Sequence, residues 1–399
     1  MRSWVLARSR AVTVCACLAL VAGLAGCSAA GSSTVTVAGS TLSIYAAQPP
    51  AGAGGQEAKD VIAAEQLALQ QAGDQAGKFK IRFVRPDGKE VSDNARTAVE
   101  DQSAIAYLGE IEPGTSKDSL PITNELGLLQ VSPTDTASFL TTISPSVPDS
   151  PLKFYPSRTT YHETFARVVP TTIQEASDQV SELEALHIDK LYVASDGSPY
   201  GASVAFQVAQ DARGARPGIA VATGPATAAK VTRVDAKAVF FGASSEATAT
   251  HFFDSVASAS PNVKLFAPSA LYDNAFVSGL ASVAQRDLYV SSPGFMTGDL
   301  PPAGAKFVTD FRSAYGHNPA PEAIFGYEAM AAVLSVIRQA GSFASNRTNI
   351  VHDFRTLKDR ASVLGTYSLN NGDTNLEPFV FSRVQSGQLT PFKFFPAQG

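Results

Sequence analysis

Cysteine is scarce in this chain, and the shortage restricts its chemistry. Only three of the 399 residues are cysteine, Cys15, Cys17 and Cys27. All three stand in or beside an N-terminal leader, so the rest of the chain offers no disulfide and no thiolate cluster for zinc. Beyond the leader, no apolar run approaches the ~20 residues that a helix needs to cross a bilayer.

Basic residues are outnumbered by acidic ones. The chain has 31 Lys and Arg against 36 Asp and Glu, and three of the arginines belong to residues 1–26, which leaves a net charge of −8 on the remaining 373 residues. This balance argues against nucleic acid or an anionic lipid face as the partner. The length is more than one ordinary core accommodates, which predicts two domains.

Signatures of catalysis are also missing. The five histidines include no HExxH pair and none at metal-ligand spacing. There is no GxSxG elbow, no GxGxxG after the first expected strand and no complete phosphate loop. We therefore expect neither an enzyme, nor a metal site, nor a bound cofactor.

The N-terminus is a targeting segment. Three arginines by residue 10 precede an apolar stretch over 11–21, and small residues lead to Cys27. This pattern predicts a signal peptide over residues 1–26, the alternatives being an ordinary signal without lipid or an uncleaved membrane helix. Because a Cys follows small residues, it resembles a bacterial lipoprotein signal, and the resemblance implies acylation of Cys27. The protein would then be an extracytoplasmic lipoprotein anchored in the cell envelope.

Alternating strands and helices follow a small, polar tether over residues 27–40. Short apolar runs such as 42–46 and 79–84 alternate with helically spaced segments such as 56–71. Such alternation predicts βαβ units and an α/β fold with parallel sheets. Residues 142–161 interrupt it with four prolines and many Ser and Thr, so we expect a long loop there.

Several motifs in order along the chain resemble one family. They are Ala106–Gly109 followed by Thr115 and Ser116, the stretch Leu128–Thr136, Phe165–Pro170, Asp196–Gly201 with its Tyr-Gly, and a late helix pair over 311–327. Together they resemble the type I periplasmic binding proteins of ABC importers, in the branched-chain (Leu/Ile/Val-binding) amino acid branch. The similarity covers about residues 41–399.

The resemblance implies two Rossmann-like lobes with parallel central sheets, joined by a hinge of three crossings. The crossings would fall near residues 168, 292 and 377. The first lobe would take residues 41–168 and 293–376, and the second would take 169–292 and 377–399. A ligand would bind in the cleft between them, at the carboxyl ends of the strands.

Ligand residues of the first lobe are expected where loops meet helix N-termini, because unpaired N–H groups there suit a carboxylate. The candidates are Thr115, Ser116, Thr134, Asp135 and Thr136. The alternative is that these side chains only cap helices, since Ser, Thr and Asp are preferred caps in any protein. Gln56 stands where the family often has an aromatic, so it would hydrogen-bond to the ligand or face solvent.

Ligand residues of the second lobe are expected to be Tyr200, Ala243, Ser244, Ser269 and Tyr272. Tyr200 would be a rim contact or would pack over a helix start, and Tyr272 would line the cleft or be a half-buried helix tyrosine. Ser269 stands near the acidic residue with which amino-acid binders hold the ligand ammonium. Burying an ammonium without a counter-charge is costly. Asp135 or Asp273 would supply that charge, or the ligand is not a free α-amino acid.

The expected function is capture of a small polar solute, an amino acid or a related amide or carboxylate, for an ABC permease. The alternatives are a ligand-sensing receptor that signals to a membrane partner and a scaffold lipoprotein whose cleft has degenerated. We expect a monomer. The loop 142–161, with Phe154, Tyr155 and Tyr161, would be a lid, a partner surface or a loop pinned to the first lobe.

Overall fold

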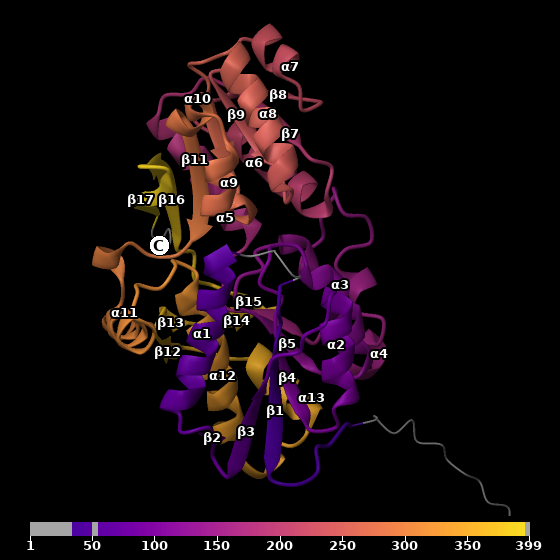
Figure 1. Ribbon diagram of the computed structural model, residues 1–399. Helices are drawn as coiled ribbons and strands as arrows, with labels where there is room; N and C mark the ends of the chain where they lie inside the picture. Colours follow the sequence, from indigo (N-terminus) through magenta and orange to yellow (C-terminus); the bar gives the residue numbers. More distant parts are fainter. Residues whose placement is uncertain (1–33, 50–54, 396–399) are drawn as a thin grey trace, which may run out of the picture. The chain divides into compact units, whose positions relative to one another are not determined.

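The computed structural model describes residues 34–49 and 55–395 (Figure 1). The predicted signal peptide and Cys27 lie outside the described residues. Within these ranges no helix combines the length and the apolar character that crossing a membrane requires.

The first sheet is formed by the N-terminal strands in the order β2-β3-β1-β4-β5-β6. All neighbours are parallel except the short β2, which runs antiparallel to β3. Apart from Thr41 at the start of β1, the central strands β1, β4 and β5 are fully buried, as parallel strands covered on both faces usually are. The strands are β1 (Thr41–Ala46), β2 (Gln75–Ala76), β3 (Phe79–Val84), β4 (Ala104–Leu108), β5 (Leu129–Ser132) and β6 (Phe165–Arg167).

The second sheet has the order β17-β16-β11-β10-β9-β7-β8. Strands β7 to β11 are parallel, whereas β16 and β17 form an antiparallel hairpin along the free edge of β11. This sheet is therefore mixed rather than wholly parallel. Its strands are β7 (Lys190–Ser195), β8 (Ala220–Thr223), β9 (Ala238–Gly242), β10 (Lys264–Ala267), β11 (Leu288–Pro293), β16 (Phe379–Gln385) and β17 (Gln388–Phe395).

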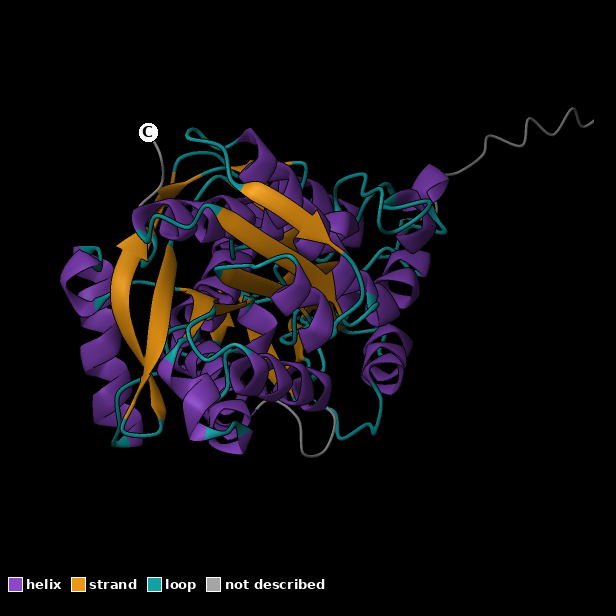
Figure 2. Ribbon diagram, turned by 90° about the horizontal axis from the view of Figure 1, so that it is seen from above, coloured by secondary structure: helices purple, strands orange, loops and turns teal. Residues whose placement is uncertain are grey.

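Helices cover both sheets (Figure 2). In the first lobe, meaning the first sheet with its helices, they are α1 (Gly55–Gln71), α2 (Val91–Glu100), α3 (Ser116–Glu125), α4 (Arg158–Tyr161), α11 (Pro302–Tyr315), α12 (Ala323–Ala340) and α13 (Arg347–Arg355). In the second lobe, built on the second sheet, they are α5 (Thr172–Ala185), α6 (Pro199–Gly214), α7 (Ala228–Arg233), α8 (Glu246–Ala259), α9 (Asn274–Gly279) and α10 (Ser282–Arg286). Short hairpins β12 (Arg360–Ser362) with β13 (Gly365–Tyr367), and β14 (Leu369–Asn370) with β15 (Asp373–Thr374), precede β16.

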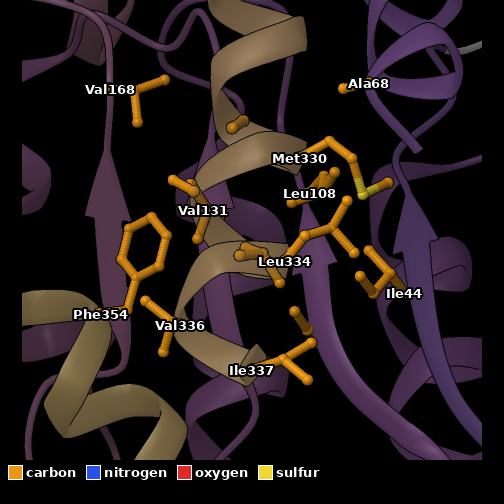
Figure 3. Close-up of a cluster of buried hydrophobic side chains, with 14 of the residues drawn as sticks. Ile44, Ala68, Leu108, Val131, Val168, Met330, Leu334, Val336, Ile337 and Phe354 are labelled. Carbon is orange, nitrogen blue, oxygen red and sulfur yellow. The ribbon is translucent and has the colours of Figure 1, made fainter. Parts of the chain in front are cut away.

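The chain changes lobe three times: after β6, after β11 and before β16. Helix α12 is buried over most of its length and packs on the first sheet, although it follows the second sheet's main strands in sequence. Figure 3 shows Met330, Leu334 and Ile337 of α12 among Ile44 and Leu108 of the first sheet. The first core is thus completed by residues more than two hundred positions downstream.

The C-terminal part of the predicted tether, residues 35–37, is bonded to the first lobe. Thr36 forms an isolated bridge with Asn346, and the N–H of Val37 donates to the carbonyl of Ser345 at 2.7 Å. Val37 is buried in the first core. Residues 35–37 therefore belong to the folded first lobe, and a free tether would have to end before them.

Candidate functional site

Asp135 organises the loops at the carboxyl ends of β4 and β5. Its carboxylate accepts hydrogen bonds from the N–H of Gly114 at 2.6 Å and of Ser116 at 2.9 Å, and from the N–H of Ala137 at 3.0 Å. It thereby satisfies unpaired N–H groups at the start of α3, as a capping side chain does. Asp135 is fully buried. The capping alternative describes this residue well.

Three of the predicted first-lobe residues carry hydroxyls that, like the carboxylate of Asp135, hydrogen-bond to the backbone. The hydroxyl of Ser116 accepts from the N–H of Glu110 at 3.0 Å, and that of Thr134 donates to the carbonyl of Ile111 at 2.6 Å. Thr115 is at the N-cap position of α3, and its hydroxyl donates to the carbonyl of Glu112 at 2.6 Å. These side chains fix the shape of the loop that would face a ligand.

Thr136 is the predicted first-lobe residue that reaches the second lobe. Its hydroxyl lies 3.4 Å from the hydroxyl of Ser269, and both residues are buried. Close by, Gly114 of the first lobe packs on Tyr200 of the second: a Cβ added at Gly114 would lie 2.9 Å from the Cβ of Tyr200. The structure therefore brings Thr136, Ser269 and Tyr200 together, with the lobes in contact at this point.

A buried acid does lie beside Ser269, but it belongs to helix α5 and not to the loop that carries Ser269. The carboxylate of Glu175, on α5, accepts from the N–H of Ser269 at 2.6 Å, from the hydroxyl of Ser291 at 2.6 Å and from that of Tyr200 at 3.4 Å. The hydroxyls of Tyr200 and Ser269 lie 3.1 Å apart. Burial raises the pKa of Glu175, and the hydrogen bonds oppose that shift. Glu175 thus orients two of the predicted ligand residues.

Sequence reasoning missed Glu175, because the buried face of α5 is not apolar in sequence. On α5 the positions Thr172, Glu175, Ala176 and Gln179 are all buried. They follow the spacing i, i+3, i+4, i+7 of one helix face. Because Thr172, Glu175 and Gln179 are polar, this face resembles a solvated one in the sequence, and only the structure shows that the carboxylate of Glu175 is buried, which is costly without partners.

Two predicted second-lobe residues do not join this group. Ala243 is fully buried in the apolar core behind the second sheet. Ser244 is exposed, its N–H donates to Asp196 at 2.9 Å, and its hydroxyl donates to Ser198 at 3.1 Å. Both hold the loop after β9 rather than meeting Thr136 or Ser269.

Gln56 and Tyr272 line a groove of about 800 Å³ shared by the two lobes. Its walls come from the start of α1, the segment 295–300 after β11, helix α11, the loop 317–321 and strand β17. The amide of Gln56 donates to Asp60 at 2.8 Å, and Asp60 also lies 3.0 Å from the Nε2 of His317. Gln56 therefore hydrogen-bonds within the wall of the groove instead of stacking.

Several carboxylates lie near one another beside this groove, on both lobes. Burial, together with the nearby Asp273 and Glu246, raises the pKa of Glu112 to about 7. Burial and Asp273 also raise the pKa of Glu57, which accepts a hydrogen bond from Asn274 at 3.3 Å. None of Glu57, Glu112 or Asp273 takes part in an ion pair within the described part of the chain.

A metal site does not emerge from these acids. Over residues 34–49 and 55–395, no three His, Cys, Asp or Glu side chains are placed to hold a metal ion. The arrangement offers hydrogen-bonding groups and negative charge to a ligand.

Solved structures with the same fold include several solute-binding proteins. The leucine-binding protein LivK of Thermotoga maritima superimposes with a TM-score of 0.74 at 17% identity, over 89% of this chain and 99% of its own. A substrate-binding protein of an ABC transporter from Desulfitobacterium hafniense, in complex with Leu, gives 0.71 at 18%, over 88% and 100%. A solute-binding protein from R. palustris, in complex with benzoate, gives 0.65 at 16%, over 90% and 97%.

Sequence comparison identifies the family directly. No curated protein matches the chain. The sequence profile of the family described as Periplasmic binding protein, however, matches residues 44–388. That range runs from within β1 to the first residue of β17 and includes every predicted ligand residue. The chain belongs to the periplasmic binding protein family.

Proposed function

We propose that this protein captures a small polar solute between its lobes, outside the cytoplasm, and delivers it to an ABC permease. The observation that carries the proposal is the convergence of residues from both lobes, Thr136 with Ser269 and Gln56 with Tyr272, around one contact and its adjoining groove. Relatives of the same fold bind leucine or benzoate, which are small solutes with a carboxylate. The proposed lobes are residues 41–168 with 293–376 and residues 169–292 with 377–399, and the strand membership of the two sheets supports this division.

Hinge closure is the proposed mechanism. The solute binds to one lobe, the other lobe closes over it, and the closed form is recognised by the permease. The solute must bind the closed state more tightly than the open state, because otherwise it shifts no population. We propose that the protein acts as a monomer, held at the membrane by acylation of Cys27.

The counter-charge for a ligand ammonium is proposed to be Asp273. Asp135 is committed to three backbone N–H groups. One carboxylate oxygen of Asp273 caps α9 through the N–H of Ala275, whereas the other has no hydrogen-bond partner among the described residues. Asp273 stands near Glu57 and Glu112. This negative rim favours a ligand that carries at least one positive charge.

Calorimetric titration of the purified protein with leucine, lysine, glutamine, benzoate and succinate tests the proposal. Binding of any of these supports solute capture, and Thr136→Ala should weaken it without unfolding the protein.

A scaffold with a degenerate cleft is the second candidate, because Thr136, Tyr200, Ser269 and Glu175 already satisfy one another. Absence of heat and of thermal stabilisation across a broader solute panel would favour the scaffold.

A further inference from the structure

The loop that interrupts the first α/β block extends across both lobes. It leaves the first sheet after β5 and returns to it at β6. We define its middle part, residues 137–157, as the strap. Covalently the strap belongs to the first lobe, since both of its ends lead into strands of the first sheet. Its contacts with the second lobe therefore connect the lobes non-covalently, in addition to the three covalent crossings of the chain.

The strap is fastened to the first lobe near its C-terminal end. The N–H of Ser157 donates to the side-chain carbonyl of Asn124, on α3, at 2.9 Å. Tyr155 is buried, and its hydroxyl donates to the carbonyl of Leu140 at 2.8 Å, which closes the strap on itself. Just beyond the strap, the ring of Tyr161 covers Gly127, where an added Cβ would come within 2.6 Å of it.

The strap also touches the hinge. The hydroxyl of Thr141 donates to the carboxylate of Asp373 at 2.7 Å, and the amide of Asn371 donates to the carbonyl of Thr141 at 3.0 Å. Ser138 exchanges hydrogen bonds with Thr172 at the start of α5, directly after the first crossing. Contacts so close to a hinge can persist while the lobes rotate.

The contact with α6 is different, because α6 lies within the body of the second lobe. The hydroxyl of Ser144 lies 3.3 Å from that of Ser203 on α6. Ser144 is paired with Val147 in an isolated bridge, so the two residues form one tight turn. Val147 is 3% exposed and belongs to the same apolar cluster as Val204 and Val208 of α6.

This apolar cluster extends without interruption from the first lobe to the second. Phe139, Leu140, Val147 and Phe154 of the strap join it, together with Leu120 of α3 below and the residues of α5 and α6 above. Figure 1 shows α3 in the lower lobe and α6 in the upper one. Rotation of α6 away from α3 would expose buried strap residues to water, at a cost of roughly 25 cal/mol per Å² of apolar surface.

We propose that the strap is a closure device: its 144–147 turn docks on α6 when the lobes close and resists their opening. The hydrogen bonds of the 144–147 turn involve none of the predicted ligand residues, so this turn would add to the stability of the closed state without binding the solute. The proposal rests on the proposed hinge motion but not on the identity of any ligand. If the strap holds the lobes partly closed without ligand, a smaller part of the ligand's binding free energy is spent on closing them.

Distances between the lobes, measured without ligand, test whether the strap favours the closed state. Spin labels on cysteines introduced at the exposed Arg96 on α2 and Arg213 on α6 report lobe separation by pulsed dipolar spectroscopy. Val147→Asp places a charge in the buried turn, and Leu152→Asp places the same charge on the strap where the side chain is 56% exposed. We expect Val147→Asp to shift the distances to longer values and Leu152→Asp to leave them as in the parent.

A folded Val147→Asp protein with the parent's distance distribution would overturn the proposal. If that variant does not fold, Val147→Ala is used, which removes two methyl groups and should broaden the distribution in the same direction. An unchanged distribution for Val147→Ala would then overturn it. Because no solute is present, the outcome is independent of whether the calorimetric titration finds a ligand.

Discussion

Arg167 and Asp373 join the end of the first sheet to the last crossing of the chain. The Nε of Arg167 donates to the carboxylate of Asp373 at 2.8 Å, and the arginine side chain is completely buried. The other guanidinium nitrogens donate to the carbonyls of Asp135 and Ala137 and to the hydroxyl of Thr141. One side chain therefore holds together the hinge, the strap and the loop that carries Thr136.

Removal of Asp373 should destabilise the protein substantially. Asp373→Ala leaves a buried guanidinium without its counter-charge, and we expect a loss of roughly 2–3 kcal/mol in the free energy of unfolding, since Asp373 itself is partly exposed. Asp310→Ala is the control, because it breaks a comparable pair with Lys306 on the surface of α11. That variant should lose less than about 1 kcal/mol. Urea unfolding measures both, and equal losses would contradict the role given to Asp373.

Gly114→Ala should weaken the contact between the lobes. Gly114 has φ +83°, and an added Cβ would meet Tyr200 at 2.9 Å. Gly197 is a matched control, because it has φ +81° and nothing within 4 Å of an added Cβ. Both alanines carry the backbone strain of about 1 kcal/mol, and only the first adds a steric clash.

We therefore expect Gly114→Ala to lower the melting temperature more than Gly197→Ala does, and to increase the radius of gyration in small-angle scattering. Identical scattering curves for the two variants would mean that Gly114 and Tyr200 do not limit the approach of the lobes.

Glu110 should make the protein less stable as pH rises. Burial raises the pKa of Glu110 from 4.5 to about 8, against the hydrogen bonds from Ser119 and Tyr107. Between these two pH values the folded state binds more protons than the unfolded state, so the stabilising effect is complete below pH 4.5 and is lost as pH rises through about 8. Glu110→Gln should reduce this slope. Chemical unfolding at several pH values measures it, with Glu100→Gln, on the exposed end of α2, as the control.

Asp273→Asn tests the proposed counter-charge. If the ligand carries an ammonium, the substitution should weaken binding by about an order of magnitude, because the ammonium loses its proposed counter-charge. Binding of benzoate, which has no ammonium, should be unaffected or improved. Asp273→Asn preserves the cap of α9, since Asn also accepts at this position. Equal affinity of both proteins for every cationic solute would exclude Asp273 from the site.

Much of the architecture was predictable because apolar runs and helical spacing record burial. The apolar runs at 42–46 and 79–84 correspond to β1 and β3, and the helically spaced segment 56–71 corresponds to α1. Strands β8 and β17 were not predicted, because both are edge strands with partly exposed side chains, and β17 contains Pro391. Edge strands tolerate polar residues and proline, so their sequences lack the buried pattern.

The site was less predictable than the fold, because its partners are distant in sequence. Glu175 meets Ser269 across 94 positions, and Thr136 meets Ser269 across 133. The hydroxyls of Thr134 and Ser116 could be placed on loops from the sequence, but whether they face a ligand or a backbone group depends on loop geometry. Ala243 and Ser244 show the same limit, since adjacent positions on one loop differ completely in exposure.

The hairpin of β16 and β17 has a consequence for how the chain matures. The second sheet contains strands from 190 onward, yet β11 finds its neighbour β16 only at residues 379–385. A chain synthesised from its N-terminus therefore cannot complete the second sheet until almost its last residues have been made. A premature stop anywhere before β16 would leave β11 with an unpaired flank, ready to pair with another truncated copy, so nonsense variants should accumulate as aggregates rather than as shortened, working protein.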